Sequence, residues 1–236
     1  MIDFSLHQQL LQTNTSSDTT STPKEHGKQY NPYMNNEGTV FGFKGKDFIM
    51  LTGDTRLSSG YSIISRESPK LFKLTEKVFL ASSGMYADIL SLYKNLKIRV
   101  ELYKTATKYE PTVESIAQLL STTLYGRRFF PYYTFNILAG VNNNGEFKLY
   151  GYDAVGSFDS LDYVANGSGK EQILPILDSL LKHGYDHVDA AVGESLAKTA
   201  MNCCSNRDTY TGDKMDLVIL YRDGTFESKQ FELRKD

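Results

Sequence analysis

The sequence predicts an α+β fold in which two antiparallel β-sheets pack face to face between pairs of helices, a four-layer αββα sandwich. Two observations lead to this prediction. Strand-like runs and helical periodicity alternate in blocks, in the order strands, two helices, strands, two helices, strands. The helices therefore come in pairs, whereas a doubly wound parallel sheet requires a helix after each strand.

The first block of strands begins with a hairpin. Residues 39–43 and 48–52 are rich in apolar and β-forming side chains, and the turn-like tetrad Lys-Gly-Lys-Asp at 44–47 separates them. Such a pattern is typical of two antiparallel strands joined by a tight turn. Shorter strands are expected at 61–65 and 78–82.

A first pair of helices follows. A helix over residues 86–105 is predicted because apolar or aromatic residues recur there at helical spacing, namely Ile89, Tyr93, Leu96, Val100 and Tyr103. Pro111 and Thr112 open the next helix, since proline and threonine favour the start of a helix. Its apolar face extends to Leu124.

The second half of the chain repeats this order. Strands are predicted at 134–141 and 146–152, joined by the turn Asn-Asn-Asn-Gly, with a further strand near Tyr163. Helices are predicted over 171–182 and 187–204, with Pro175 in or near the first turn of the former, where a missing N–H is tolerated. Two closing strands are expected at 216–221 and 226–231.

Composition limits the possible functions. The chain has 236 residues and a formal net charge of -2, so a broad basic surface for nucleic acid is not expected. Its two cysteines, Cys203 and Cys204, are adjacent, which leaves no disulfide framework and favours a reducing compartment. No apolar run approaches the length of a membrane helix. No metal-ligand spacing is present, and no cofactor is expected.

The first 28 residues differ from the rest. Between Thr13 and Thr22 the chain holds only Ser, Thr, Asn and Asp. A segment of this kind buries too little apolar area to offset the entropy of ordering it. Residues 1–28 are therefore expected to be a flexible leader, either a plain tail or a removable propeptide, ahead of one domain at 29–236.

Familiar catalytic patterns are absent. The Gly-Ser-Gly-Lys segment at 167–170 is similar to a phosphate-binding loop, but Glu171 stands where that loop needs Ser or Thr. No histidine lies near a strand-borne Ser or Cys, which argues against a Ser-His-Asp hydrolase.

One set of residues does suggest a site. Asp54 follows the opening hairpin, Lys70 lies 16 residues further on, Ser168 precedes the third helix, and Asp208 and Thr211 lie between the last helix and the closing strands. In the predicted sandwich these points can converge near the start of the hairpin. The simpler interpretation is that Asp54 and Lys70 form a buried structural pair.

At these residues the chain resembles the beta subunits of the proteasome core particle, which have the N-terminal-nucleophile hydrolase fold. The resemblance covers residues 30–236. In active members the first mature residue is a threonine whose hydroxyl attacks the peptide carbonyl, while its own α-amine takes the proton. The resemblance aligns Asp54, Lys70, Ser168, Asp208 and Thr211 with the residues that complete that site.

The resemblance also places the nucleophile. In the family, the nucleophile, the Asp and the Lys are equally spaced, and counting 16 residues back from Asp54 gives Gly38, which has no attacking group. Thr39 is the alternative nucleophile, but it lies one residue too close to Asp54. A one-residue slip in a strand turns each side chain to the opposite face. A non-catalytic chain is therefore expected.

Further motifs narrow the resemblance to a branch of the family that lacks peptidase activity and keeps a short extension before the glycine. The motifs are YNPY at 30–33, GDTRL at 53–57, RRFFPYY at 127–133, YGYDAVGS at 150–157 and LRKD at 233–236. This resemblance implies that residues 1–28 are a propeptide, cut between Lys28 and Gln29.

The resemblance implies the partners and the location as well. The expected partners are other proteasome alpha and beta subunits in stacked hetero-heptameric rings, with no nucleic acid and no membrane, in the cytoplasm and nucleus. The expected role is structural, in a particle that degrades proteins of the ubiquitin pathway. Two alternatives stay open: an active threonine peptidase that uses Thr39, and a small-molecule amidohydrolase of the same fold.

Overall fold

The structure, a computed structural model, describes residues 31–182 and 184–235. One compact unit spans Tyr33–Asp236, and all that follows concerns this unit. The other unit, Met1–Pro32, lies almost wholly outside the described residues. The expected leader at 1–28 and its cut between Lys28 and Gln29 fall there, so both stay predictions.

Two five-stranded sheets form the centre of the unit, and every strand pairing within them is antiparallel. The first sheet has the order β10-β1-β2-β11-β12. Its strands are Tyr163–Gly167, Thr39–Lys44, Phe48–Asp54, Lys214–Tyr221 and Phe226–Glu232. The predicted opening hairpin is present, and its turn closes where the Gly45 amide donates to the Phe48 carbonyl at 2.8 Å.

The second sheet has the order β5-β6-β7-β8-β9. Its strands are Leu71–Thr75, Val78–Gly84, Thr134–Val141, Phe147–Tyr152 and Phe158–Ser160. A separate two-stranded sheet joins β3, Leu57–Ser59, to β4, Ser62–Ser65.

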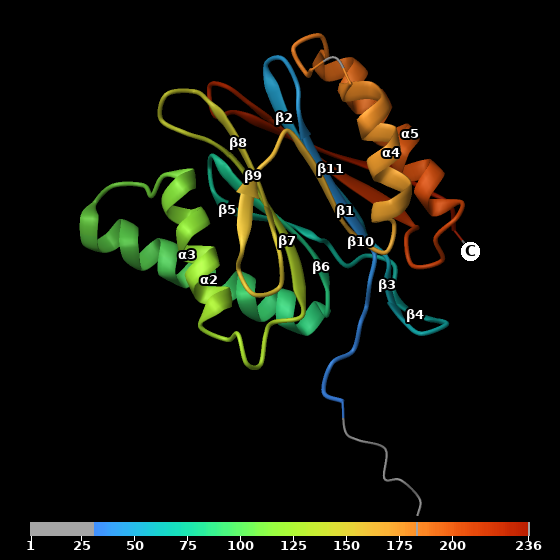
Figure 1. Cartoon of the computed structure of the whole chain (residues 1–236), viewed down its shortest axis with the longest axis horizontal. Helices are drawn as coiled ribbons and strands as arrows, with labels where there is room; N and C mark the ends of the chain where they lie inside the picture. The colour runs from blue at the N-terminus through green and yellow to red at the C-terminus, as the bar shows by residue number, and fades with distance from the viewer. Residues whose placement is uncertain (1–30, 183, 236) are drawn as a thin grey trace, which may run out of the picture. The chain divides into compact units, whose positions relative to one another are not determined.

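Helices cover the outer faces of the two sheets, α2 and α3 on one side and α4 and α5 on the other (Figure 1). Their bounds are Tyr86–Thr107, Val113–Tyr125, Lys170–Leu181 and Ala190–Ser205. The Thr112 side chain caps α3 by accepting a hydrogen bond from the Ser115 amide at 3.2 Å. This arrangement confirms the predicted αββα sandwich.

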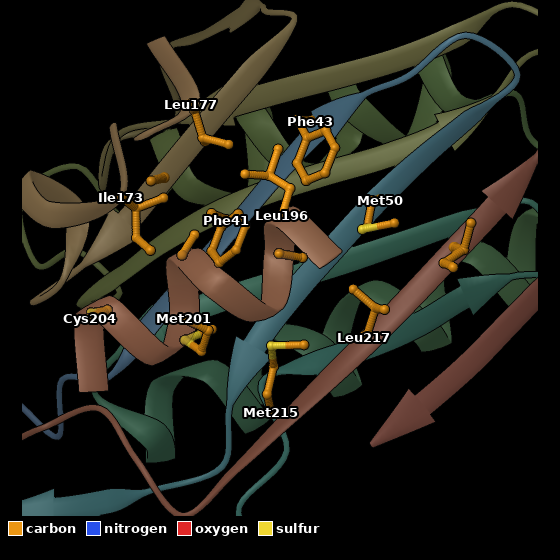
Figure 2. Close-up of a cluster of buried hydrophobic side chains, with 14 of the residues drawn as sticks. Phe41, Phe43, Met50, Ile173, Leu177, Leu196, Met201, Cys204, Met215 and Leu217 are labelled. Carbon is orange, nitrogen blue, oxygen red and sulfur yellow. The ribbon is translucent and has the colours of Figure 1, made fainter. Parts of the chain in front are cut away.

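Three apolar clusters separate the four layers. Between the sheets, β1 and β2 contribute Val40 and Leu51, which pack with Ile137 and Ala139 of β7. A second cluster fills the space under α2 and α3, around Leu92 and Leu120. The third lies between the first sheet and the pair α4 and α5, and Figure 2 shows its side chains. They include Phe41, Phe43, Met50, Ile173, Leu177, Leu196, Met201, Cys204, Met215 and Leu217.

Alternation along β1 determines which residues reach which layer. Successive side chains of a strand point to opposite faces, so Phe41 and Phe43 face the helices α4 and α5 while Val40 faces the second sheet. Thr39 shares the face of Phe41. The side chain of Thr39 therefore points toward the helices α4 and α5.

The structure corrects three details of the sequence predictions. The strands β3, β5 and β9 are short and were not expected. The last helix begins at Ala190 rather than 187. Pro175 lies in the second turn of α4, beyond the tolerant first turn, so it has no N–H to donate to the Glu171 carbonyl.

The buried face of helix α2 is shorter than the sequence predicts. Tyr103 shares the spacing of the buried residues of α2, but it is exposed, since the buried face ends at Val100.

Over the residues that the structure describes, no helix has both the length and the apolar character to cross a bilayer.

Candidate functional site

Gly38 lies immediately before β1 in a left-handed conformation, with φ of +85°. A Cβ atom added there would lie 2.4 Å from Cε and 2.5 Å from Nζ of Lys70, and 2.8 Å from a carboxylate oxygen of Asp54. These separations are far below van der Waals contact. Position 38 therefore faces the Asp54–Lys70 pair, and the lysine occupies the space that a side chain would need.

Asp54 and Lys70 form a buried ion pair, with 2.9 Å between Lys70 Nζ and Asp54 Oδ1. The ammonium also donates to the carbonyl oxygens of Asp54 at 3.1 Å and Arg56 at 2.6 Å. Burial raises the pKa of the Asp54 carboxyl, while the charge of Lys70 and hydrogen bonds from the Thr39 and Arg56 amides oppose that rise.

The side chain of Thr39 lies on the opposite face of β1 and is fully buried. Its Oγ1 accepts a hydrogen bond from the Gly169 amide at 2.9 Å and lies 2.7 Å from Thr211 Oγ1 and 3.7 Å from Cys204 Sγ. These partners are the residue before α4, a residue of α5 and a residue of the loop that follows α5. Only the backbone amide of Thr39 reaches the ion pair, donating to Asp54 Oδ1 at 2.8 Å.

The Asp208 carboxylate organises a second polar cluster. Its Oδ2 accepts hydrogen bonds from the hydroxyls of Ser168 and Thr211, both at 2.6 Å. Because the single hydroxyl proton of Thr211 goes to Asp208, the hydroxyl of Thr39 donates to Thr211. Thr39 thus sits at the buried end of a hydroxyl chain that ends on a carboxylate.

A second buried ion pair lies beside this cluster. Arg56 Nε lies 2.8 Å from Asp213 Oδ2, and both side chains are almost completely buried. Arg66 also contacts the Asp213 carboxylate. Burial acts to raise the pKa of Asp213, but the hydrogen bonds and charges of the two arginines outweigh it and hold the pKa below its usual range.

The chain segment just before Gly38 is tied down through Asn36, which is buried. The Asn36 side chain donates to the Ser58 carbonyl and accepts from the Tyr86 amide, both at 2.9 Å. Its backbone amide donates to the Gly84 carbonyl at 3.3 Å. Asn36 therefore links β3, the end of β6 and the start of α2.

An open cleft of about 280 Å³ lies next to this segment. Its lining includes Glu37, Gly84, Ser168 and Lys170. Burial raises the pKa of Glu37, and the charge of Asp208 adds to that rise.

The structure brings the predicted site residues into two adjacent clusters. Gly38, Asp54 and Lys70 form one, and Ser168, Asp208 and Thr211 form the other. Two backbone amides connect them: Thr39, as above, and Gly212, which donates to Asp54 Oδ2 at 3.4 Å.

Sequence reasoning missed several members of this network. The Gly169 amide, the Gly212 amide and Cys204 act through backbone or sulfur contacts that no residue pattern marks. The pairing of Arg56 with Asp213 could have been suspected, because both are charged residues flanking predicted buried strands. A charge at the end of a buried strand generally needs a partner.

Comparisons with known proteins agree with this fold. Residues 34–220 match the proteasome family, described as "Proteasome subunit". The chain is 40% identical over 223 residues to proteasome subunit beta type-1 of Arabidopsis thaliana, covering 90% of this chain and 99% of the relative. It is also 40% identical to the proteins of that name from Dictyostelium discoideum, over 91% of this chain and 93% of the relative, and from Danio rerio, over 91% and 92%.

Proposed function

This chain belongs to the proteasome subunit family, and we propose that it is a non-catalytic beta subunit of the core particle. Its role is to form part of the wall of the proteolytic chamber and to hold active neighbours in position. The relatives that share 40% of its sequence carry the name beta type-1, which supports a beta-ring role.

One observation carries the non-catalytic part of the proposal: position 38 holds glycine and faces Lys70 and Asp54. Nucleophilic catalysis in this fold requires a hydroxyl or thiol at that place. Gly38 offers neither, and the lysine fills the space where such a group would stand.

The alternative nucleophile, Thr39, has a suitable hydroxyl in an unsuitable place. Its side chain has no exposed surface and is engaged by Gly169 and Thr211 on the helix side of β1. A peptide carbonyl would have to displace these contacts to reach Oγ1. The same considerations argue against a small-molecule amidohydrolase.

The test uses the particle assembled with the full chain and a threonine-directed covalent inhibitor. We expect the inhibitor to label other beta subunits and to leave this chain unlabelled, as read by mass spectrometry of the separated subunits. A label on Thr39, or a mature chain that begins at Thr39, would establish the active alternative instead.

Maturation of the chain is part of the same proposal. Since neither Gly38 nor Gln29 carries a hydroxyl or thiol, the chain cannot cut itself at either position. We propose that an active neighbouring subunit cuts between Lys28 and Gln29. Inactivating the neighbours should leave this chain longer at its N-terminus by mass spectrometry. A start at Gln29 in a particle without any active nucleophile would implicate a separate protease.

Membership in the family supports assembly with other proteasome subunits. We propose that the chain contacts other alpha and beta subunits within stacked hetero-heptameric rings, in the cytoplasm and the nucleus. Native mass spectrometry of the particle, with subcellular fractionation of a tagged chain, tests both. A tagged chain that stays outside the particle would exclude the assembly role.

A further inference from the structure

The end of α3 and its connection to β7, whose course Figure 1 shows, carry a group of large exposed side chains. Phe129 is 88% exposed, Phe130 59% and Tyr125 55%. The two arginines between them, Arg127 and Arg128, are exposed as well. We call these five residues the aromatic–arginine patch. Single exposed apolar residues are ordinary, but a group of large ones marks a contact surface.

The backbone beneath the aromatic–arginine patch is fixed. Hydrogen bonds of 3.0 Å run from the Arg127 amide to the Leu124 carbonyl, from Arg128 to Tyr125, and from Phe130 to Arg127. The ring of Tyr33 stacks on Phe130 with 5.4 Å between centroids, and its hydroxyl donates to the Pro131 carbonyl at 2.8 Å. An exposed surface that is already ordered loses little entropy when a partner binds.

Arg127 keeps its binding edge available, and Arg128 keeps the part that remains after Nη1 donates to the Tyr125 hydroxyl. The guanidinium of Arg127 lies over the Tyr132 ring at 4.3 Å, and that of Arg128 over the Tyr125 and Phe129 rings at 5.0 and 4.5 Å. Stacking uses the face of a guanidinium, whereas its N–H donors lie in the plane and point outward. Within residues 31–182 and 184–235, neither arginine forms an ion pair.

The chain segment around the patch has no acidic residue of its own, and the nearby Asp88 carboxylate of α2 accepts from the Tyr133 amide at 2.9 Å. Between Glu114 and Glu146 there is no Asp or Glu. The negative end of the α3 dipole favours a nearby cation and accounts for an arginine at this place, but it does not account for two exposed phenyl rings. Arginine and aromatic residues together are enriched at the centres of protein interfaces.

We infer that the aromatic–arginine patch is a docking site for an acidic segment of a neighbouring subunit in the particle. Two carboxylates of that segment bind Arg127 and Arg128, and an apolar side chain packs on Phe129 and Phe130. A permanent neighbour fits better than a transient one, because large rings left in water favour aggregation. A nucleic acid fits less well, since the chain's net charge is -2 and the patch has only two cations. This inference rests on the proposed function.

The first experiment maps the occupant without disturbing the charges. The full chain is expressed with the photo-crosslinker p-benzoylphenylalanine in place of Phe129, and the assembled particle is purified and irradiated. We expect a crosslink to a segment of another subunit that carries at least two Asp or Glu residues. No protein crosslink, a crosslink to a segment without carboxylates, or a crosslink to nucleic acid would overturn the inference.

The second experiment measures the contribution of the charges. The wild-type chain and a variant, differently tagged, compete for incorporation, and their ratio in the particle is determined. We expect the double variant Arg127→Glu/Arg128→Glu to be under-represented by about tenfold. The pair Arg127→Lys/Arg128→Lys, which keeps the charge but loses the fork geometry, should be intermediate. Arg99→Glu, at an exposed arginine of α2 that forms no ion pair among the described residues, is the matched control and should incorporate normally.

Two controls distinguish a folding defect of the double variant from a loss of docking. Circular dichroism of the double variant must match that of wild type, and charge reversal in the crosslinked acidic segment must restore incorporation of the variant. Equal incorporation of the double variant, or no rescue, would overturn the inference. If the wild-type chain fails to enter the particle, the proposed function fails. If it enters but Phe129 finds no acidic segment, only the docking site fails.

Discussion

The ammonium of Lys70 donates one hydrogen bond to the carboxylate of Asp54, at 2.9 Å, and its other two to the carbonyl oxygens of Asp54 and Arg56. A lysine ammonium has three N–H donors, so this arrangement uses all of them. Lys70 in this chain is therefore a fully bonded structural cation, with no donor left for a group at position 38.

This saturation predicts that Lys70→Met is strongly destabilising. The variant leaves the Asp54 carboxylate buried without its cation, which costs about 3–5 kcal/mol. The free energy of unfolding of the full chain in urea measures this loss. Lys235→Met, which removes an exposed partner of Glu232, is the matched control and should change little. Equal effects of the two variants would contradict the structural role of Lys70.

Restoring a hydroxyl at position 38 should not restore a nucleophile. Gly38→Thr places a Cβ about where Lys70 now lies, in a backbone conformation that costs a non-glycine residue about 1–3 kcal/mol. We expect lower stability and no labelling of the variant by a threonine-directed inhibitor in the particle. Gly38→Ala, with the Cβ but no hydroxyl, should lose as much stability. Labelling of Thr at position 38 would contradict this prediction and would show that the Lys70 side chain can move aside.

Removing the hydroxyl of Thr39 should affect stability and leave peptidase activity unchanged. Thr39→Val keeps the shape but leaves the Gly169 amide buried without an acceptor, at a cost of about 1–3 kcal/mol. Thr39→Ser keeps the acceptor and should cost less. Thermal unfolding of the chain and peptide hydrolysis by the particle are the two measurements. Accumulation of chain with an intact leader in Thr39→Val particles would point to a self-cleaving Thr39.

We expect Asp213 to account for part of the loss of folding stability at acid pH. Its pKa is held below the usual value of about 3.9, so the folded state binds fewer protons at this group than the unfolded state. The contribution to stability is therefore present above pH of about 4 and is lost as pH falls through the lowered pKa.

The variant Asp213→Asn tests this sign. Asn tolerates the positive φ of 69° at this position, and it cannot titrate. We expect the variant to be less stable at neutral pH and to lose less further stability between pH of about 4 and 2, as measured by urea unfolding at several pH values. Asp47→Asn, at an exposed aspartate, should keep the wild-type acid dependence. Parallel pH curves for wild type and Asp213→Asn would contradict the assignment.

The layers of the fold could be predicted because burial leaves a period in the sequence. The strand Thr134–Val141 matches its predicted bounds, since it is a nearly continuous apolar run ended by an asparagine-rich turn. The strands β3, β5 and β9 leave no such pattern, because they have only 3, 5 and 3 residues and are partly exposed. Each pairs with the strand next to it in sequence, but so short a run shows no clear period.

The candidate site shows the same division. Asp54 and Lys70 could be paired from their spacing and the resemblance that it carries, and the ion pair is present. The partners of Thr39 could not be predicted, because the Gly169 amide and the Thr211 hydroxyl come from segments more than 100 residues away along the chain. Backbone donors carry no residue signature, so only the folded chain reveals them.

Asn36 has a consequence for how far the chain can be trimmed. An exopeptidase that removes residues inward from a fresh end needs each residue to be released in an extended, accessible form. Asn36 is held by β3, β6 and α2 at once, and Tyr33 is held through its ring and its hydroxyl. Trimming would therefore stall near Tyr33, whatever enzyme performs it. The proposed cut between Lys28 and Gln29 sets the length of the mature extension, and the fold sets the shortest length to which that extension can be trimmed.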